Sequence, residues 1–480
     1  MNGGLTQRHR DTERSYVELR ARSAFSFGDG AIAPETLAER AAEMGFAALG
    51  LCDAAELGGM IRFALAARTA GVRPITGAEL RVDGYPVGVL ARDEVGFRNL
   101  SALVSHARLE SGRGEPGVPF EVLAERAAGL HVLTGPATGP IAARILEQRP
   151  EEARWELARW RGVFGERFAV EVQRHHVSGA EGALVDALIE TAEGAGVPWV
   201  VTNEPRYLDA EGRRVHDLQT ALRHGVDYDT ALRRGLLLPN GEWRLKGPAE
   251  MALLWKGREA GLEESARIAD ACAFDLRWLR PPLPRFDLPP GHTDDSFLAA
   301  KVLEGALKRW GGIDAKQQAQ LEHELRVIEK LGFAGFFLIM WDAVGFARRR
   351  GILCQGRGSA ANSAVAYCLE ITAVDPVRHG LLFERFLSEA RADGGTEAPD
   401  IDVDFEADRR EEVLDYVYGR YSRQHAAITA VTQVYSAPTA IQDMMRALGY
   451  PAELAFRLSK RLHWAGPAEG ADALAGELGV

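Results

Sequence analysis

The chain contains 480 residues, a length that predicts two or three domains. Apolar residues make up 46% of it and charged residues 26%, an ordinary globular mixture that can bury a sizeable core. The net charge of −11 at pH 7 excludes a protein whose whole surface binds nucleic acid, although it permits a local basic groove.

The sequence favours a cytosolic protein. Residues 1–15 are polar and charged and lack the apolar stretch of a secretory signal. The longest apolar run, Phe333 to Trp341, is far too short to cross a bilayer, so we expect no membrane contact. The cysteines lack metal-ligand spacing, which argues for a reducing compartment without a disulfide framework or a zinc site: Cys52, Cys272, Cys354 and Cys368.

The first 280 residues alternate between strand and helix patterns. Apolar runs predict strands over residues 16–19, 47–51, 74–80, 130–134, 168–172 and 197–202. Amphipathic spacing predicts helices over residues 34–44 and 59–70. Repeated units of this kind predict a largely parallel sheet or barrel with helices outside.

The composition of the sequence changes between Arg277 and His292. Five prolines crowd this segment, which therefore cannot hold a regular helix, and we expect a domain boundary there. Helical spacing returns around residues 321–331 and 336–350, and again over residues 438–448 and 452–462.

Residues 399–405 alternate carboxylate and apolar side chains. In a strand, Asp400, Asp402 and Asp404 would share one face, while the apolar residues between them enter a core. Alternate residues of a strand lie ~6–7 Å apart, so these carboxylates could converge on one Mg²⁺ or on two. The alternative is an exposed edge strand whose carboxylates are simply solvated.

A glycine-rich loop precedes this strand, with the sequence Gly-Arg-Gly-Ser-Ala-Ala-Asn-Ser over residues 356–363. Glycine lets a backbone approach an anion closely, and Ser359 suits the cap of a helix whose first amides favour phosphate. Arg357 could add a bidentate charge. The alternative is an ordinary serine-capped glycine turn. A phosphate-binding loop followed by a strand of metal-binding carboxylates is the combination of groups that nucleotidyl transfer requires.

Four segments together resemble C-family bacterial DNA polymerases, the α subunits of the polymerase III type: residues 354–363, 381–387, 399–405 and 409–413. Cys354-Gln355 before the loop and Asn362 within it are more similar to the error-prone (ImuC-type) paralogue than to the replicative subunit. The resemblance extends from about residue 16 to about residue 450.

This resemblance implies an α/β architecture in three parts. Residues 1–283 would form a PHP-like (βα) barrel, residues 284–431 a polymerase β-like nucleotidyltransferase palm, and residues 432–480 the start of a helical thumb.

The resemblance also implies roles for individual residues of the palm. Asp400 and Asp402 match the first two metal-binding catalytic aspartates, with Asp404 in support. Gly358 and Ser359 match the loop that holds the triphosphate of the incoming nucleotide. Arg385 matches a basic residue that faces the same phosphates, unless it pairs with Glu384 or a nearby aspartate.

The PHP-like part departs from its family at the metal site. Arginines stand where histidine ligands are expected, at Arg20, Arg22 and Arg206, while Asp29 and Glu79 match surviving acidic ligand positions. We therefore expect no metal here, and arginines that neutralise the orphaned carboxylates instead. His175 and His176 are adjacent and would point opposite ways on a strand, which argues against a shared metal.

The function implied by the resemblance is DNA-directed DNA synthesis of the error-prone, translesion type. Two Mg²⁺ ions would serve the complete active site, and the substrates would be primer–template DNA and dNTPs. The third catalytic aspartate of the family lies beyond Val480, so we expect the 480-residue chain alone to be inactive. The resemblance also implies that other translesion-synthesis proteins and the sliding clamp would bind through the family's C-terminal region, the part that lies beyond Val480. The alternatives are a non-catalytic DNA- or protein-binding remnant and, disfavoured by the lost histidines, a PHP phosphoesterase.

Overall fold

The computed structural model describes residues 16–112, 114, 116–278, 284–387, 400–429 and 431–461. The chain divides into two compact units, one of Met1–Leu279 with Val434–Val480 and one of Arg280–Gln433. The domain boundary that we expect near residue 283 lies outside the described residues. Within the described part of the chain, no helix is both long and apolar enough to span a membrane.

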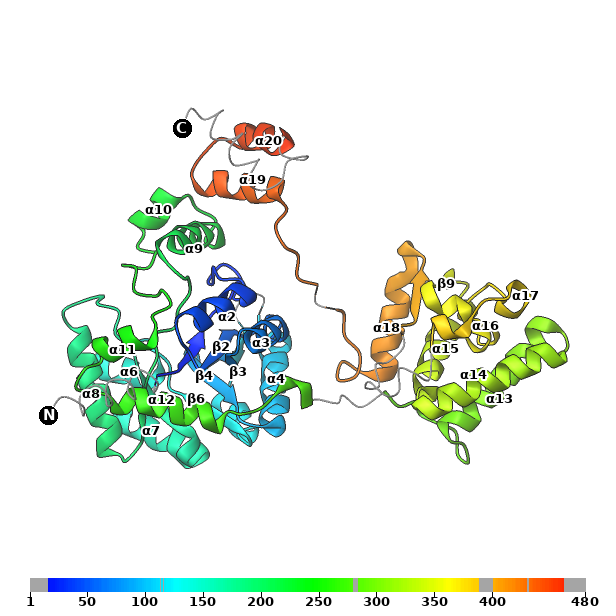
Figure 1. Cartoon of the computed structure of the whole chain (residues 1–480), viewed down its shortest axis with the longest axis horizontal. Helices are drawn as coiled ribbons and strands as arrows, with labels where there is room; N and C mark the ends of the chain where they lie inside the picture. Colours follow the sequence, from blue (N-terminus) through cyan, green and yellow to red (C-terminus); the bar gives the residue numbers. More distant parts are fainter. Residues whose placement is uncertain are drawn as a thin grey trace. The chain divides into compact units, whose positions relative to one another are not determined.

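An eight-stranded sheet forms the centre of the first unit (Figure 1). Its strands run in the order β1-β2-β3-β4-β6-β7-β8, with β5 beside β3. They are β1 (Glu18–Ala21), β2 (Ala48–Ala54), β3 (Arg73–Val82), β4 (Tyr85–Ala91), β5 (Gly117–Val118), β6 (Leu130–Leu133), β7 (Phe168–Val172) and β8 (Trp199–Val201). The expected α/β fold with a largely parallel sheet is confirmed, since only β4 runs antiparallel to its neighbours.

The strands predicted from the sequence did not include β4. Asp83 and Gly84 join β3 to β4, and both have positive φ, 49° and 88°, as a two-residue type I′ hairpin turn requires. The Asp-Gly pair between two apolar runs is a hairpin signal that could have located this strand.

The sheet curls until its two ends meet. Just beyond β1, the amide of Arg22 donates to the carbonyl of Pro205 beyond β8, at 3.0 Å. The amide of Asn203 likewise donates to the Glu18 carboxylate at 2.8 Å. This closure brings residues from both ends of the sheet to one place.

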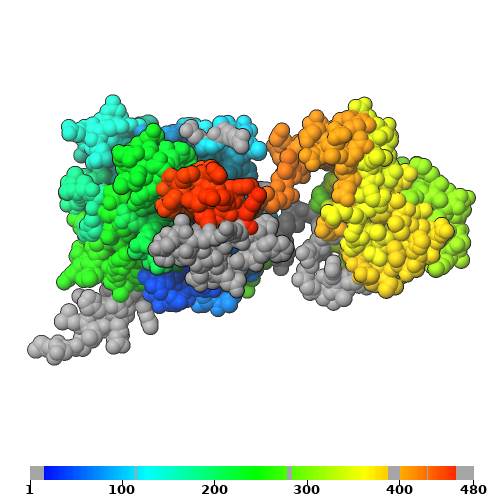
Figure 2. Space-filling view, turned by 90° about the horizontal axis from the view of Figure 1, so that it is seen from above, coloured from blue at the N-terminus to red at the C-terminus, as the bar shows by residue number. Residues whose placement is uncertain are grey.

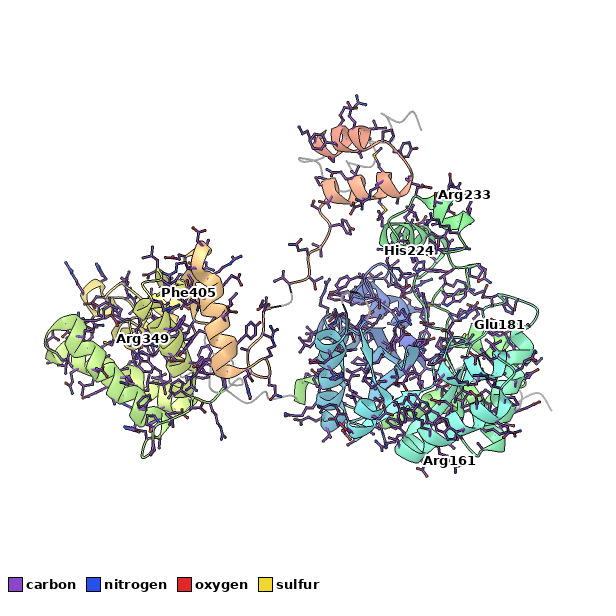
Figure 3. All side chains as sticks on the ribbon, turned by 180° about the vertical axis from the view of Figure 1, so that it is seen from behind. Arg161, Glu181, His224, Arg233, Arg349 and Phe405 are labelled. Carbon is purple, nitrogen blue, oxygen red and sulfur yellow. The ribbon has the colours of Figure 1, made fainter. Side chains whose placement is uncertain are left out.

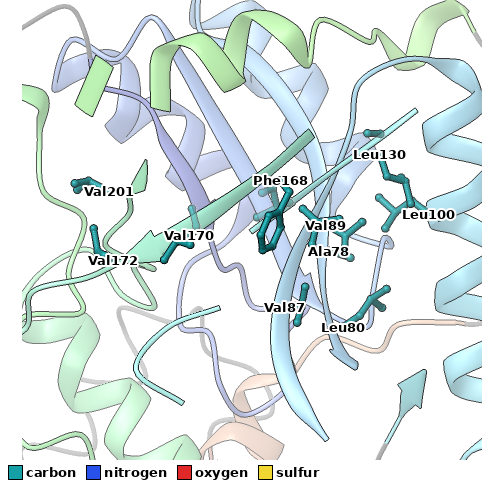
Figure 4. Close-up of a cluster of buried hydrophobic side chains, with 14 of the residues drawn as sticks. Ala78, Leu80, Val87, Val89, Leu100, Leu130, Phe168, Val170, Val172 and Val201 are labelled. Carbon is teal, nitrogen blue, oxygen red and sulfur yellow. The ribbon is translucent and has the colours of Figure 1, made fainter. Parts of the chain in front are cut away.

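Both faces of the sheet are buried, which explains its nearly continuous apolar strands. Figure 4 shows one face, where Ala78 and Leu80 of β3 lie near Leu100 of α4. On the other face, Leu90 and Leu133 pack with residues of α12.

Helices pack around this sheet. The helices of the first unit are α2 (Pro34–Glu43), α3 (Met60–Thr69), α4 (Glu94–Glu110), α5 (Phe120–Glu125), α6 (Pro140–Leu146), α7 (Pro150–Phe164), α8 (Glu181–Gly194), α9 (Ala210–Arg223), α10 (Tyr228–Arg233), α11 (Pro248–Leu254), α12 (Ala260–Ala271), α19 (Ala437–Ala447) and α20 (Ala452–Arg461). Of these, α19 and α20 lie apart from the sheet, with α19 beside α9 (Figure 1). Short 3₁₀ turns are η1 (Gly165–Arg167) and η2 (Leu276–Trp278).

The two C-terminal helices belong to this first unit. α19 packs against α20 and also against α9, and the red atoms of the C-terminal helices adjoin green atoms in Figure 2. Our assignment of residues 432–480 to a thumb stays a prediction.

The second unit is mainly helical with one two-stranded sheet. Its elements are α13 (Asp294–Trp310), α14 (Ala315–Leu331), α15 (Ala334–Arg349), β9 (Cys354–Arg357), η3 (Gly358–Asn362), α16 (Ala364–Cys368), α17 (Pro376–His379), η4 (Phe383–Arg385), β10 (Asp402–Phe405), η6 (Ala407–Arg409) and α18 (Arg410–Tyr421). Capping boxes at Thr293 and Asp314 begin α13 and α14, and left-handed glycines at Gly311 and Gly332 end them.

A buried carboxylate on α14 holds the start of α16. Glu324 is fully buried and accepts hydrogen bonds from the Ser363 hydroxyl at 2.7 Å and from the amides of Ala364 and Val365 at 2.9 and 3.0 Å. Burial raises the pKa of Glu324 above its ordinary value, although these donors oppose the shift. Glu324 thereby fixes the segment that follows the glycine-rich loop.

We expect Glu324→Ala to destabilise the second unit, because it leaves several buried donors without an acceptor. The cost should reach at least about 1–3 kcal/mol, the usual effect of one unsatisfied buried group. Hydrogen–deuterium exchange of α16 in urea measures it. The control is Glu322→Ala on the exposed side of α14, which should change stability by less than ~0.5 kcal/mol. Equal effects of the two substitutions would contradict the role of Glu324.

Candidate active site

The candidate site of the second unit is built on the pairing of β9 with β10. The two strands are antiparallel, and Arg357, Gly356 and Gln355 lie directly opposite Asp402, Val403 and Asp404, respectively. Phe405, labelled in Figure 3, packs against the small apolar cluster that holds Ala347 and Ile352. This packing anchors the end of the carboxylate strand.

The predicted alternation of the aspartate segment is confirmed. Ile401 is buried, and Val403 packs against the core of the second unit. Asp402 and Asp404 lie within β10, whereas Asp400 precedes its first residue and is exposed. Among the described residues, no three His, Cys, Asp or Glu side chains are arranged as a metal-binding group, and metal binding by the aspartates stays a prediction.

Gly358 lies against the carboxylate strand, and Gly356 lies against the backbone of Ile371. Gly358 has a φ of 66°, and a Cβ added there would lie 3.8 Å from Asp402 Oδ2. A Cβ on Gly356 would lie 2.6 Å from the carbonyl oxygen of Ile371, which also accepts the Gly356 amide at 2.8 Å. The loop and the carboxylate strand are therefore direct neighbours.

Our assignment of Ser359 as a helix cap is wrong. Ser359 is exposed in η3, and the cap of α16 is Ser363, whose hydroxyl accepts the Ala366 amide at 3.0 Å. Ser363 is the cap of this helix because its hydroxyl can also donate to the buried Glu324. The exposed side chain of Ser359 cannot reach that carboxylate. Since Glu324 already fills the N-terminus of α16, a nucleotide phosphate would have to use the η3 backbone and Arg357 instead.

Arg385 lies in η4, whose residues contact η3. Its side chain is exposed, and within the described residues it makes no ion pair. Glu384 pairs instead with His323, at 3.1 Å. The contact between η4 and η3 places Arg385 near the loop, as a role toward the same phosphates requires.

A second cluster of charged residues lies in the first unit, where the ends of the sheet meet. Arg20 binds Glu171 at 2.7 Å and also contacts Glu79. Arg22 binds Glu79 at 2.5 Å and also contacts Asp29 and Glu204. All of these residues are at most 8% exposed. The arginines at the histidine positions do pair with the surviving carboxylates.

Two further arginines complete the cluster. Arg206 binds Asp29 at 2.9 Å and Glu204 at 3.2 Å, and Arg223 binds Asp29 at 3.1 Å. Burial alone would raise the pKa values of Asp29 and Glu204, but the neighbouring arginines lower both below their ordinary values.

Sequence reasoning missed Glu171, Glu204 and Arg223. Glu171 is the one charged residue of the apolar strand β7, and such a residue requires a buried counter-charge. No feature of the neighbouring sequence predicts that Arg223, the last residue of α9, pairs with Asp29. His175 and His176 do not face one ion, because His175 is buried against Trp243 while His176 is exposed.

Two protein-family models match this chain, one in its N-terminal part and one in its C-terminal part. The model of the bacterial DNA polymerase III alpha NTPase domain matches residues 296–475, and the PHP domain model matches residues 18–175. The chain is 42% identical over 479 residues to the error-prone DNA polymerase of Mycolicibacterium paratuberculosis, covering 95% of this chain and 43% of that protein. It belongs to the bacterial DNA polymerase III alpha family.

Other members of this polymerase family are similarly related. The error-prone DNA polymerase of Anaeromyxobacter sp. strain K is 39% identical, over 93% of this chain and 46% of its own length. The chain thus spans less than half the length of these relatives. Among solved structures, an amidohydrolase from Chromobacterium violaceum covers 40% of this chain and 87% of its own, with a TM-score of 0.26 and 15% identity.

We expect Arg206→Gln to destabilise the first unit in a pH-dependent way. Asp29 and Glu204 have folded pKa values below their unfolded ones, so their stabilisation is present above about pH 4 and is lost as the pH falls through the folded values. The substitution should cost about 1–3 kcal/mol near neutral pH and less in acid. Hydrogen exchange of β1 and β8 in urea, at about pH 7 and about pH 3.5, measures the difference.

The control for this experiment is Arg98→Gln, which removes an exposed pair with Glu94 and should cost less than ~0.5 kcal/mol at either pH. A loss for Arg206→Gln that is equal at both pH values would contradict the proposed charge pairing.

Proposed function

We propose that this chain carries the nucleotide-binding loop and two metal-binding carboxylates of an error-prone, translesion DNA polymerase. The observation that supports this most directly is the contact between loop and strand: Gly358 adjoins Asp402 across paired β9 and β10. Nucleotidyl transfer needs a phosphate-binding backbone and acidic metal ligands within reach of one another.

The residues of β10 suit Mg²⁺. Asp402 and Asp404 offer exposed carboxylate oxygens, the ligands that Mg²⁺ prefers, and Arg357 already pairs with both. Asp400 and Asp402 would hold the ions, with Asp404 in support. Bound Mg²⁺ would lower the pKa of the primer 3′-hydroxyl and stabilise charge on the α-phosphate and the leaving pyrophosphate.

The loop residues would orient the incoming dNTP. Gly358 can bring its backbone close to a phosphate because it has no side chain and already adopts positive φ. The exposed hydroxyl of Ser359 and the guanidinium of Arg385 are free to contact the same triphosphate. Primer–template DNA is the proposed second substrate, and contacts with the sliding clamp and other translesion proteins remain predictions.

Primer extension tests this function. Because the chain spans 43% of the Mycolicibacterium paratuberculosis relative, it is assayed joined to the C-terminal region of that relative, and we expect this longer protein to extend a primer. In that longer protein Asp402→Asn should lower the rate more than ~100-fold, since even residues that merely support a metal ligand contribute 10–100-fold. The control is Glu322→Gln, which should leave the rate unchanged. Full activity of Asp402→Asn would overturn the proposal.

We also propose that the first unit holds no catalytic metal. Guanidinium groups of Arg20 and Arg22 lie between the carboxylates that a cation would need, and they would repel it. Metal analysis of the purified chain should therefore find no stoichiometric Zn²⁺ or Mn²⁺ in this unit. A bound metal that is lost in Glu79→Gln would show the proposal to be wrong.

A further inference from the structure

Arg357 lies on the same face of the two-stranded sheet as the carboxylates of β10. It is the last residue of β9, directly opposite Asp402, and opposed residues of an antiparallel pair project to one side. Its Nε atom lies 3.3 Å from Asp404 Oδ1, and its Nη2 atom 3.9 Å from Asp402 Oδ2. One guanidinium group thus bridges the two carboxylates that are candidates for metal binding.

This bridge is held loosely. The side chains of Arg357, Asp402 and Asp404 are 63%, 45% and 67% exposed. In the first unit, by contrast, the side chain of Arg20 is completely buried among its carboxylates. An exposed ion pair is screened by water and is easily exchanged for another partner. The Arg357 side chain can therefore leave the carboxylates without any rearrangement of a core.

Arg357 also adjoins the proposed phosphate site. It immediately precedes Gly358, and it is a residue type that binds phosphate with two parallel hydrogen bonds. A cation on the carboxylates would repel the guanidinium, while a triphosphate would attract it. The two events favour the same movement of one side chain.

We propose that Arg357 is a positioning residue that occupies the carboxylate face until a divalent cation displaces it toward the triphosphate of the nucleotide. Arg357 then weakens cation binding in the absence of nucleotide and strengthens nucleotide binding in the presence of the cation. This inference rests on the proposed function, since it assumes that the carboxylates take a metal and that the loop takes a triphosphate.

Mn²⁺ titration of the purified 480-residue chain, followed by electron paramagnetic resonance of the free ion, tests the first half. Arg357→Gln should bind Mn²⁺ about 3–5-fold more tightly than the unsubstituted chain, the size of one exposed ion pair. Arg357→Lys keeps the charge and should resemble the unsubstituted chain. The matched control is Arg326→Gln, an equal change of charge at an exposed position of α14, which should leave the affinity unchanged.

Nucleotide titration tests the second half. With Mn²⁺ present, Arg357→Gln should bind a non-hydrolysable dNTP analogue about 10-fold more weakly than Arg326→Gln, because a charge-assisted contact is lost. The two substitution effects would then have opposite signs, which a general disturbance of the fold would not produce.

The outcomes separate the inference from the function beneath it. If Arg357→Gln binds Mn²⁺ no more tightly than Arg326→Gln, or not at all, the role of Arg357 is overturned. In that case, if Asp402→Asn in the otherwise unsubstituted chain abolishes Mn²⁺ binding, the proposed metal site is still supported. If Asp402→Asn leaves the tightened binding of Arg357→Gln unchanged, the metal lies elsewhere, and both proposals fail.

Discussion

Each unit of this chain must supply positive charge, or hydrogen-bond donors, to carboxylates that the fold has gathered in one place. Four acidic side chains meet where the curled sheet closes, and arginines from β1, from the segment after β8 and from α9 lie between them. Glu324 receives a hydroxyl and backbone amides. Without such partners, burying these groups would cost several kcal/mol each.

The carboxylates of the first unit and the aspartates of β10 in the second unit receive positive charge in different ways. In the first unit Arg20 and Arg22 are buried with the acids and contact several of them each, so their charges are held in place by the fold. In the second unit a single exposed arginine faces exposed aspartates, and its contacts can be exchanged. Burial therefore distinguishes a charge cluster that stabilises a fold from one that can take part in binding.

The position of Glu324 shapes the candidate nucleotide site as well. By satisfying the first amides of α16, it removes a helix N-terminus that could otherwise attract phosphate. The preceding loop keeps its exposed residues, and Gly358 turns it toward Asp402. The glycine-rich loop thus adjoins a helix whose N-terminal amides are already occupied by a carboxylate, so the proposed phosphate site would not use the helix dipole.

Much of this organisation can be read from the sequence because it depends on local rules. The alternation of residues 400–405 determines which side chains are buried, and the arginines at positions 20, 22 and 206 already predicted the pairing with Asp29 and Glu79 that the structure shows. Asp83-Gly84 carries the signal for β4, although the apolar runs alone did not predict that strand. The motifs in residues 354–363 and 399–405 were specific enough to indicate the polymerase family.

Other features depend on which residues distant parts of the chain bring together. The cap of α16 is Ser363 rather than Ser359 because Glu324, about forty residues earlier, reaches only the former. Arg357 faces Asp402 because of a strand register that neither segment specifies alone. Arg223, an exposed residue of α9, reaches Asp29 at the edge of the buried cluster. The sequence by itself determined the α/β class, many of the elements, the family and most charged candidates, through local spacing. Only the tertiary structure decided how these residues pair, since ion pairs and hydrogen bonds depend on distances between segments far apart in the chain.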